Sequence, residues 1–330
     1  MMKSGFRSAI AIIALSTSAF VSVTPAYAQA TRTWISGVGD DANPCSRTAP
    51  CKTFAGAISK TAATGEINCL DPGGFGAVTI TKSITLSCEG VSAGVLVAAT
   101  NGITINAAST DVIRIRGLDM EGLSSVGGSV NGINFLNGAA LYVTNVKING
   151  FGGAGSGGYG ISFTPGSNAT LVIDNVEIIR NGNTGAPTNS GGILIQPPAG
   201  VTATASITYT VIANNSNSGI RVESAAAGAV ANVALSENVV TNNGIGILLK
   251  SPAGLGPVAV NANNQTISQN ATAGVKSSGS AATLRVSNST ISGNGTGVSS
   301  SSGGIVSSYG NNRLNDNTTD GTFTGTTAQQ

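Results

Sequence analysis

The chain has 330 residues, with 16 basic and 14 acidic side chains and no histidine, and only 9% of its residues are charged. Without histidine it cannot form a Ser-His-Asp or Cys-His catalytic site. Hydrophobic residues make up 41% of the chain and glycine fills 46 positions, which argues against disorder and is typical of β-structure with many tight turns.

The first 28 residues are predicted to be a secretory signal peptide. Lys3 and Arg7 precede a short apolar run, and the small-residue triplet from Ala26 to Ala28 offers a cleavage site before Gln29. The run is shorter than the roughly 20 apolar residues that a membrane-spanning helix needs. We therefore expect an exported protein, periplasmic or extracellular, with no membrane span in the mature chain.

Cleavage would also change the charge of the protein. Removing two of the 16 basic residues leaves 14 basic against 14 acidic residues, a formal net charge of zero. A neutral exported chain has no electrostatic reason to bind nucleic acid or an anionic membrane surface. We expect neither as a partner.

All four cysteines lie near the mature N-terminus, at Cys45, Cys51, Cys69 and Cys88. An even number in an exported chain indicates disulfides, for which three connectivities are possible. We favour Cys45–Cys51 and Cys69–Cys88. A zinc site is disfavoured because no pair has the C-x₂-C spacing and histidine is missing, and we expect no metal and no cofactor.

From Met120 onward the sequence repeats with a drifting period of 23 to 34 residues. Two anchors recur, a glycine followed by Ile or Val and an apolar residue in a polar stretch. The glycines are Gly132, Gly160, Gly192, Gly219, Gly246, Gly274 and Gly297, and the apolar anchors are Met120, Ile148, Ile178, Ile212, Val240, Ile267, Ile291 and Leu314. Each repeat holds short β-prone runs without helical periodicity, which excludes a two-helix repeat.

An asparagine follows the apolar anchor by three residues in six consecutive repeats. These residues are Asn181, Asn215, Asn243, Asn270, Asn294 and Asn317. If each repeat is one coil of a solenoid, their amides stack about 4.8 Å apart and hydrogen-bond in a ladder. A core column is predicted in the same way from Phe135, Phe163, Ile195, Val222 and Leu249. The pattern predicts an all-β chain with a single parallel β-helix over residues 65–320 and a C-terminal tail at 321–330.

Residues 34–58, WISGVGDDANPCSRTAPCKTFAGAI, resemble the opening of bacterial right-handed parallel β-helix proteins of the pectin-lyase-like superfamily. The resemblance implies a right-handed solenoid with an N-terminal cap, residues 29–64, that contains an amphipathic helix. This helix would run from about Thr53 to Thr61, with Phe54 and Ile58 facing inward. The superfamily includes lyases, hydrolases, adhesins and proteins without known chemistry, so the resemblance predicts a fold and leaves the activity open.

Enzymes of this superfamily act mainly on acidic polysaccharides, and their histidine-containing motifs are missing here. One charged patch shares repeat positions: Arg116, Asp119, Lys147, Asp174 and Glu177. Two acids flanking a lysine could serve glycoside hydrolysis, but such a column also avoids like-charge repulsion on a stacked surface. We favour the structural interpretation, in which these residues form ion pairs, as Glu223 and Lys250 would one repeat apart.

Two functions are compatible with these observations. The first is an exported noncatalytic β-helix with a surface, adhesin-like or polymer-binding role, whose partner is a polysaccharide or another cell-surface polymer. The alternative is a polysaccharide lyase or glycoside hydrolase that acts on acidic glycans through the charged patch. Aromatic side chains that could stack on sugar rings are few, with Trp34, Tyr142, Tyr159 and Tyr209 as candidates. The missing motifs favour the first function.

Overall fold

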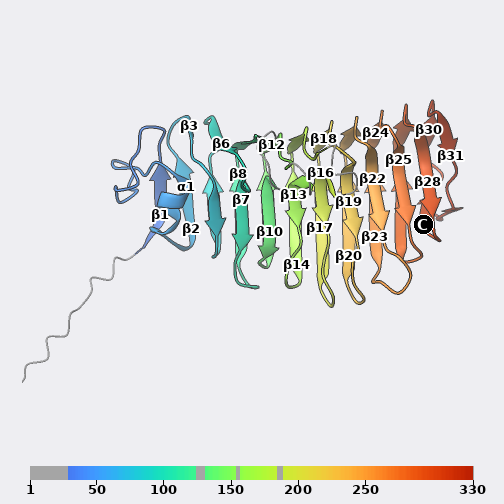
Figure 1. The fold of residues 1–330 in the computed structure, drawn as a ribbon, viewed down its shortest axis with the longest axis horizontal. Coiled ribbons are helices and arrows are strands. Elements are labelled where there is room, and N and C mark those ends of the chain that lie inside the picture. The colour runs from blue at the N-terminus through green and yellow to red at the C-terminus, as the bar shows by residue number, and fades with distance from the viewer. Residues whose placement is uncertain (1–28, 124–130, 154–156, 184–188, 330) are drawn as a thin grey trace, which may run out of the picture.

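Short strands lie side by side along the whole length of the molecule and form an elongated stack (Figure 1). The computed structural model describes residues 29–123, 131–153, 157–183 and 189–329. The predicted signal peptide, residues 1–28, lies outside the described residues. Successive strands join three sheets in turn, and all the strand pairs are parallel. This arrangement confirms the prediction of a single parallel β-helix.

The largest sheet, called sheet A here, has 12 strands among the residues that the structure describes. They are β1 (Ala30–Ile35), β2 (Thr61–Cys69), β5 (Ile84–Ser87), β8 (Val112–Arg116), β11 (Ala140–Thr144), β14 (Ala169–Asp174), β17 (Thr202–Thr208), β20 (Val230–Ser236), β23 (Val258–Asn263), β26 (Ala282–Ser287), β29 (Ile305–Ser308) and β32 (Gly325–Thr326). Side chains alternate between core and surface, as in β14, where every second residue is buried.

Sheet B follows sheet A in each coil and has ten short strands in the described part of the chain. They are β3 (Gly73–Gly74), β6 (Ala93–Val97), β9 (Leu118–Gly122), β12 (Lys147–Asn149), β15 (Glu177–Ile179), β18 (Val211–Ala213), β21 (Val239–Thr241), β24 (Thr266–Ser268), β27 (Thr290–Ser292) and β30 (Arg313–Asn315). From β12 to β27 the central residue of each strand is fully buried, so each strand anchors its coil by one apolar side chain.

Sheet C completes each coil, and ten of its strands lie within the described ranges. They are β4 (Val78–Ile80), β7 (Ile103–Asn106), β10 (Ile133–Asn137), β13 (Gly158–Phe163), β16 (Ser190–Ile195), β19 (Ser218–Glu223), β22 (Ile245–Lys250), β25 (Ala273–Ser278), β28 (Thr296–Ser301) and β31 (Thr319–Gly321). The predicted core column lies here in register: Phe135, Phe163, Ile195, Val222 and Leu249 are all fully buried.

The N-terminal end is closed by the helix α1 (Phe54–Ile58), which lies against the first strands in Figure 1. Thr53 caps the helix, because its hydroxyl accepts a hydrogen bond from the backbone N–H of Gly56. The helix is shorter than the predicted span from Thr53 to Thr61, since the chain already enters strand β2 at Thr61. Its buried residues are Phe54 and Ala57, whereas Ile58 is only partly buried.

Two disulfides hold this end together. Cys45 and Cys51 close a short loop beside the helix, with their Cα atoms 4.6 Å apart. Cys69, the last residue of β2, is joined to Cys88, which directly follows β5, with Cα atoms 4.8 Å apart. These are the pairings that we favoured from the sequence.

The asparagines form a buried hydrogen-bonded ladder in the turn between sheets B and C. Each side-chain N–H donates to the Oδ1 of the asparagine one coil further on, over 2.8–3.1 Å from Asn181 to Asn317. The same Oδ1 also accepts the backbone N–H of the preceding asparagine, as Asn294 does for Asn270. Each ladder amide additionally donates to a strand carbonyl, which for Asn270 is that of Val240. The turn backbone and the side chains therefore satisfy each other across coils.

Candidate functional site: a groove on the outer face of sheet C

Three neighbouring strands of sheet C, β13, β16 and β19, are buried on both faces, because all six residues of each strand are buried. Inward residues such as Ile220 belong to the core and are fully buried. The outward residues are buried as well, with Ser162 6%, Leu194 8% and Arg221 5% exposed. Arginine is rarely buried unless its charge is paired. Arg221 on this outer surface is therefore a candidate functional residue.

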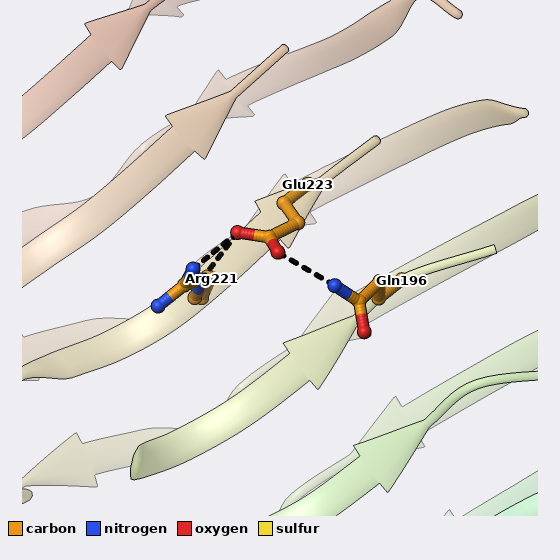
Figure 2. A network of polar contacts seen from close by, with 3 residues as sticks. All are labelled: Gln196, Arg221 and Glu223. Carbon is orange, nitrogen blue, oxygen red and sulfur yellow. Dashed lines mark hydrogen bonds and ion pairs between the residues drawn. The ribbon is translucent and has the colours of Figure 1, made fainter. Parts of the chain in front are cut away.

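The Arg221 guanidinium forms an ion pair with the Glu223 carboxylate from the same strand (Figure 2). Arg221 Nε donates to Glu223 Oε2 over 2.7 Å, and Nη2 donates to the same oxygen. The other carboxylate oxygen accepts from Gln196 Nε2 over 2.6 Å, one coil away. Residues 221 and 223 share a face because they are two positions apart on a strand. Both oxygens of this nearly buried carboxylate therefore have partners.

Tyr159 completes the buried cluster from strand β13. It is 5% exposed, and burial raises the pKa of its phenol to about 12, although the nearby positive charge of Arg221 acts in the opposite direction. Its backbone N–H donates to Asn131 Oδ1 over 2.8 Å, which fixes the start of the strand. The phenol is therefore protonated at neutral pH and serves as a neutral hydrogen-bonding group.

Two hollows meet at Arg221 and together form the groove. One, of about 330 Å³, is lined by Tyr159, Gln196, Arg221 and Glu223 among others. The next, of about 400 Å³, is lined by Arg221, Lys250 and Lys276 and contains no acidic side chain in its lining. Arg221 and Lys276 stand two coils apart in one column, because both align with Leu248. The groove thus runs along the stack and becomes cationic toward the C-terminal end.

The charged patch predicted from the sequence lies elsewhere. Asp119, Lys147 and Glu177 align on three consecutive strands of sheet B, and Arg116 and Asp174 align through Thr144 on sheet A. Within the part of the chain that the structure describes, the ion pairs are Arg32–Glu66 and Arg221–Glu223, so the patch residues are in register without pairing. Instead, Asp174 accepts a hydrogen bond from Thr208 Oγ1 over 2.6 Å.

Two further expectations are corrected. Glu223 and Lys250 align one coil apart as predicted, but Glu223 bonds to Arg221 and Gln196 instead. Arg221 lies on the same face of the same strand, and its guanidinium therefore reaches the carboxylate first. Tyr159 is buried and offers no surface for stacking on sugar.

Of the remaining aromatic candidates, Trp34 and Tyr142 are half-buried and Tyr209 is exposed. The Arg114 guanidinium covers the Tyr142 ring at 5.0 Å from its centroid. Tyr209 is therefore the candidate whose ring is most open to a ligand.

The described residues include no group of three or more His, Cys, Asp or Glu side chains that could hold a metal ion. Across the same residues, helices of the length and apolar character needed to traverse a lipid bilayer are also missing.

Comparison with known proteins gives two matches. The family model described as the right handed beta helix region matches residues 71–256, which is more than half of the chain. The crystal structure of pectate lyase Pel9A superposes with a TM-score of 0.66 at 15% sequence identity, covering 92% of this chain and 80% of that one. No curated protein matches the sequence. At this identity, the structural likeness concerns the fold alone.

Proposed function

We propose that this chain, which belongs to the family of right-handed β-helix proteins, is an exported noncatalytic protein that binds an anionic polymer in the groove of sheet C. The observation that carries the proposal is the cluster of three cations that line one hollow, Arg221, Lys250 and Lys276. A polymer with regularly spaced carboxylates or sulfates can bind several of them at once. Both disulfides are compatible with an oxidising compartment outside the cytoplasm.

The groove suits binding better than catalysis. Its one acidic side chain, Glu223, already accepts hydrogen bonds from Arg221 and Gln196, and glycoside hydrolysis requires two carboxyl groups. Lys250 and Lys276 line the more open end, where their side chains can contact a ligand. Arg221 and Lys276 align in one column two coils apart, about 9.6 Å, and Lys250 lies on the strand between them, two positions further along. A polymer laid along the stack can therefore meet one cation in each of three successive coils.

Replacing both lysines, Lys250→Ala with Lys276→Ala, is expected to weaken binding of polygalacturonate by up to about thirtyfold, since each lost contact contributes up to about 1 kcal/mol. Isothermal titration of the purified protein at low and high salt measures this. Binding of the unaltered protein should weaken as salt rises. The matched control removes two cations outside the groove, Arg285→Ala with Arg313→Ala, and should change the affinity little. Equal losses in both double variants would contradict a role for the groove.

The alternative activity, lyase or hydrolase action on acidic glycans, makes a different prediction. Turnover would appear as unsaturated ends or new reducing ends when polygalacturonate is incubated with the protein. Its loss in Asp119→Ala and in Lys147→Ala would assign catalysis to the patch on sheets A and B. Absence of both products, with binding retained, is the result that we expect.

A further inference from the structure

The turn between sheets A and B has a left-handed residue at its first position in consecutive coils. Its φ is 55° at Asn145, 53° at Asn175, 48° at Tyr209, 59° at Glu237 and 52° at Asn264. The backbone N–H of this residue donates to a carbonyl of the next coil, as Tyr209 N does to Ser236 O over 3.3 Å. The hydrogen bonding between coils therefore imposes the left-handed conformation, whatever residue occupies the position.

Asparagine is suited to this position, and tyrosine is not. A side chain with a Cβ atom is strained in the left-handed region, which asparagine tolerates best and a bulky residue worst. Packing does not compensate Tyr209, because it is 62% exposed and its phenol makes no hydrogen bond within the described part of the chain. Strained residues of this kind cluster at functional sites, which motivates a search for a function of Tyr209.

Tyr209 does not stand alone on this surface. Val211, two residues later, and Val239, its partner in register on the next coil, are 40% and 37% exposed. Asn175 and Glu237 occupy the turn position one coil before and one coil after Tyr209, about 4.8 Å away along the stack. The result is a small apolar platform with an amide on one side and a carboxylate on the other.

We propose that Tyr209, Val211 and Val239 form a stacking site for a neutral sugar ring of a glycan chain, separate from the cationic groove. Three side chains are far fewer than the 20–30 or so residues that each partner contributes to a protein interface, so one ring matches the platform better. A sugar ring presents C–H bonds on its face, which pack against the electron-rich face of an aromatic ring. Its hydroxyls can donate to Glu237 and accept from Asn175.

The charge at the site selects among sugars. Glu237 is exposed and forms no ion pair among the residues that the structure describes. A uronic acid or sulfated sugar would place a second negative charge against this carboxylate, whereas a neutral hexose would not. The two sites would thus take different polymers, an anionic one in the groove and a neutral one at Tyr209.

The decisive variant is Tyr209→Asn, which introduces the residue type that Asn145, Asn175 and Asn264 provide at this turn position. We expect the melting temperature to rise by about 2–4 °C as the strain is relieved, while affinity for a soluble neutral β-glucan falls at least tenfold. If Tyr209 had only a structural role, the variant could raise the melting temperature but would not lower the affinity for the glucan. Tyr209→Phe should keep the affinity, because it retains the stacking ring.

Two controls separate this site from its surroundings. Asn264→Tyr, at the same turn position two coils further on, should lower the melting temperature and leave binding unchanged. Lys250→Ala with Lys276→Ala should leave neutral glucan binding intact even if polygalacturonate binding is lost. The proposal is overturned if Tyr209→Asn keeps its glucan affinity, if it lowers the melting temperature, or if the unaltered protein binds only acidic glycans.

Discussion

Replacing Asn270 by alanine is expected to lower the free energy of unfolding by about 3 kcal/mol. Asn270 Oδ1 accepts from both the backbone N–H and the side-chain N–H of Asn243, and its own amide donates to Asn294 and Val240. All three asparagines are at most 2% exposed, so water cannot replace the missing partner. The substitution leaves buried donors and acceptors unsatisfied in two coils at once, which is why its effect exceeds that of an ordinary hydrogen bond.

The matched control is Asn261→Ala, an exposed asparagine on the neighbouring strand β23 that belongs to no ladder. Urea denaturation followed by circular dichroism gives both free energies, and the control should change by less than about 0.5 kcal/mol. Because each coil contacts only its neighbours, the loss at Asn270 should also accelerate amide exchange in the adjoining coils. Similar small effects of both substitutions would show that the ladder contributes little.

Removing the carboxylate of Glu223 should be at least as damaging. The variant Glu223→Ala leaves the Arg221 guanidinium, which is 5% exposed, without its counter-charge, and loss of one partner of a buried pair costs about 3–5 kcal/mol. Gln196 loses its acceptor in the same step. Thermal and urea unfolding of the variant measure the effect.

The double variant Arg221→Met with Glu223→Leu tests the interpretation. Replacing a buried ion pair by apolar residues of similar size is often neutral, so we expect stability within about 1 kcal/mol of the unaltered protein. Anionic polymer binding should nevertheless weaken, because one cation of the groove is gone. If Glu223→Ala costs less than about 1 kcal/mol, the pair is hydrated in solution and does not stabilise the groove.

The sequence predicted the coil register closely because like residues stack on like residues. Phe135 lies over Phe163 with ring centroids 4.6 Å apart, and Lys147 lies between Asp119 and Glu177 as the repeat required. Such columns are visible without a structure, because apolar or charged side chains recur at one position of the repeat. The turn residues followed the same rule and gave the asparagine ladder.

The groove was missed because it depends on contacts within a strand and on burial, which a repeat does not report. The repeat aligned Glu223 with Lys250 of the next coil and so suggested that these two residues pair. It gave no sign that Arg221, two residues earlier on the same strand, binds the Glu223 carboxylate instead. The pattern Arg-x-Glu between the core residues of a strand was the available signal. Tyr209 had a stronger signal, a tyrosine at a turn position where three of the four nearest repeats have asparagine. That signal gains meaning only when the left-handed backbone is known.

The position of the disulfides gives the molecule a mechanical polarity. Both disulfides lie between Cys45 and Cys88, and the sequence has no cysteine after Cys88. The later coils are therefore held together by hydrogen bonds and packing, without a covalent cross-link. A pulling force between the two ends acts across the stack and loads the strands one at a time. The C-terminal coils should then peel off singly, each releasing about 90 Å of chain for a repeat of about 27 residues. The cross-linked N-terminal end would resist longest.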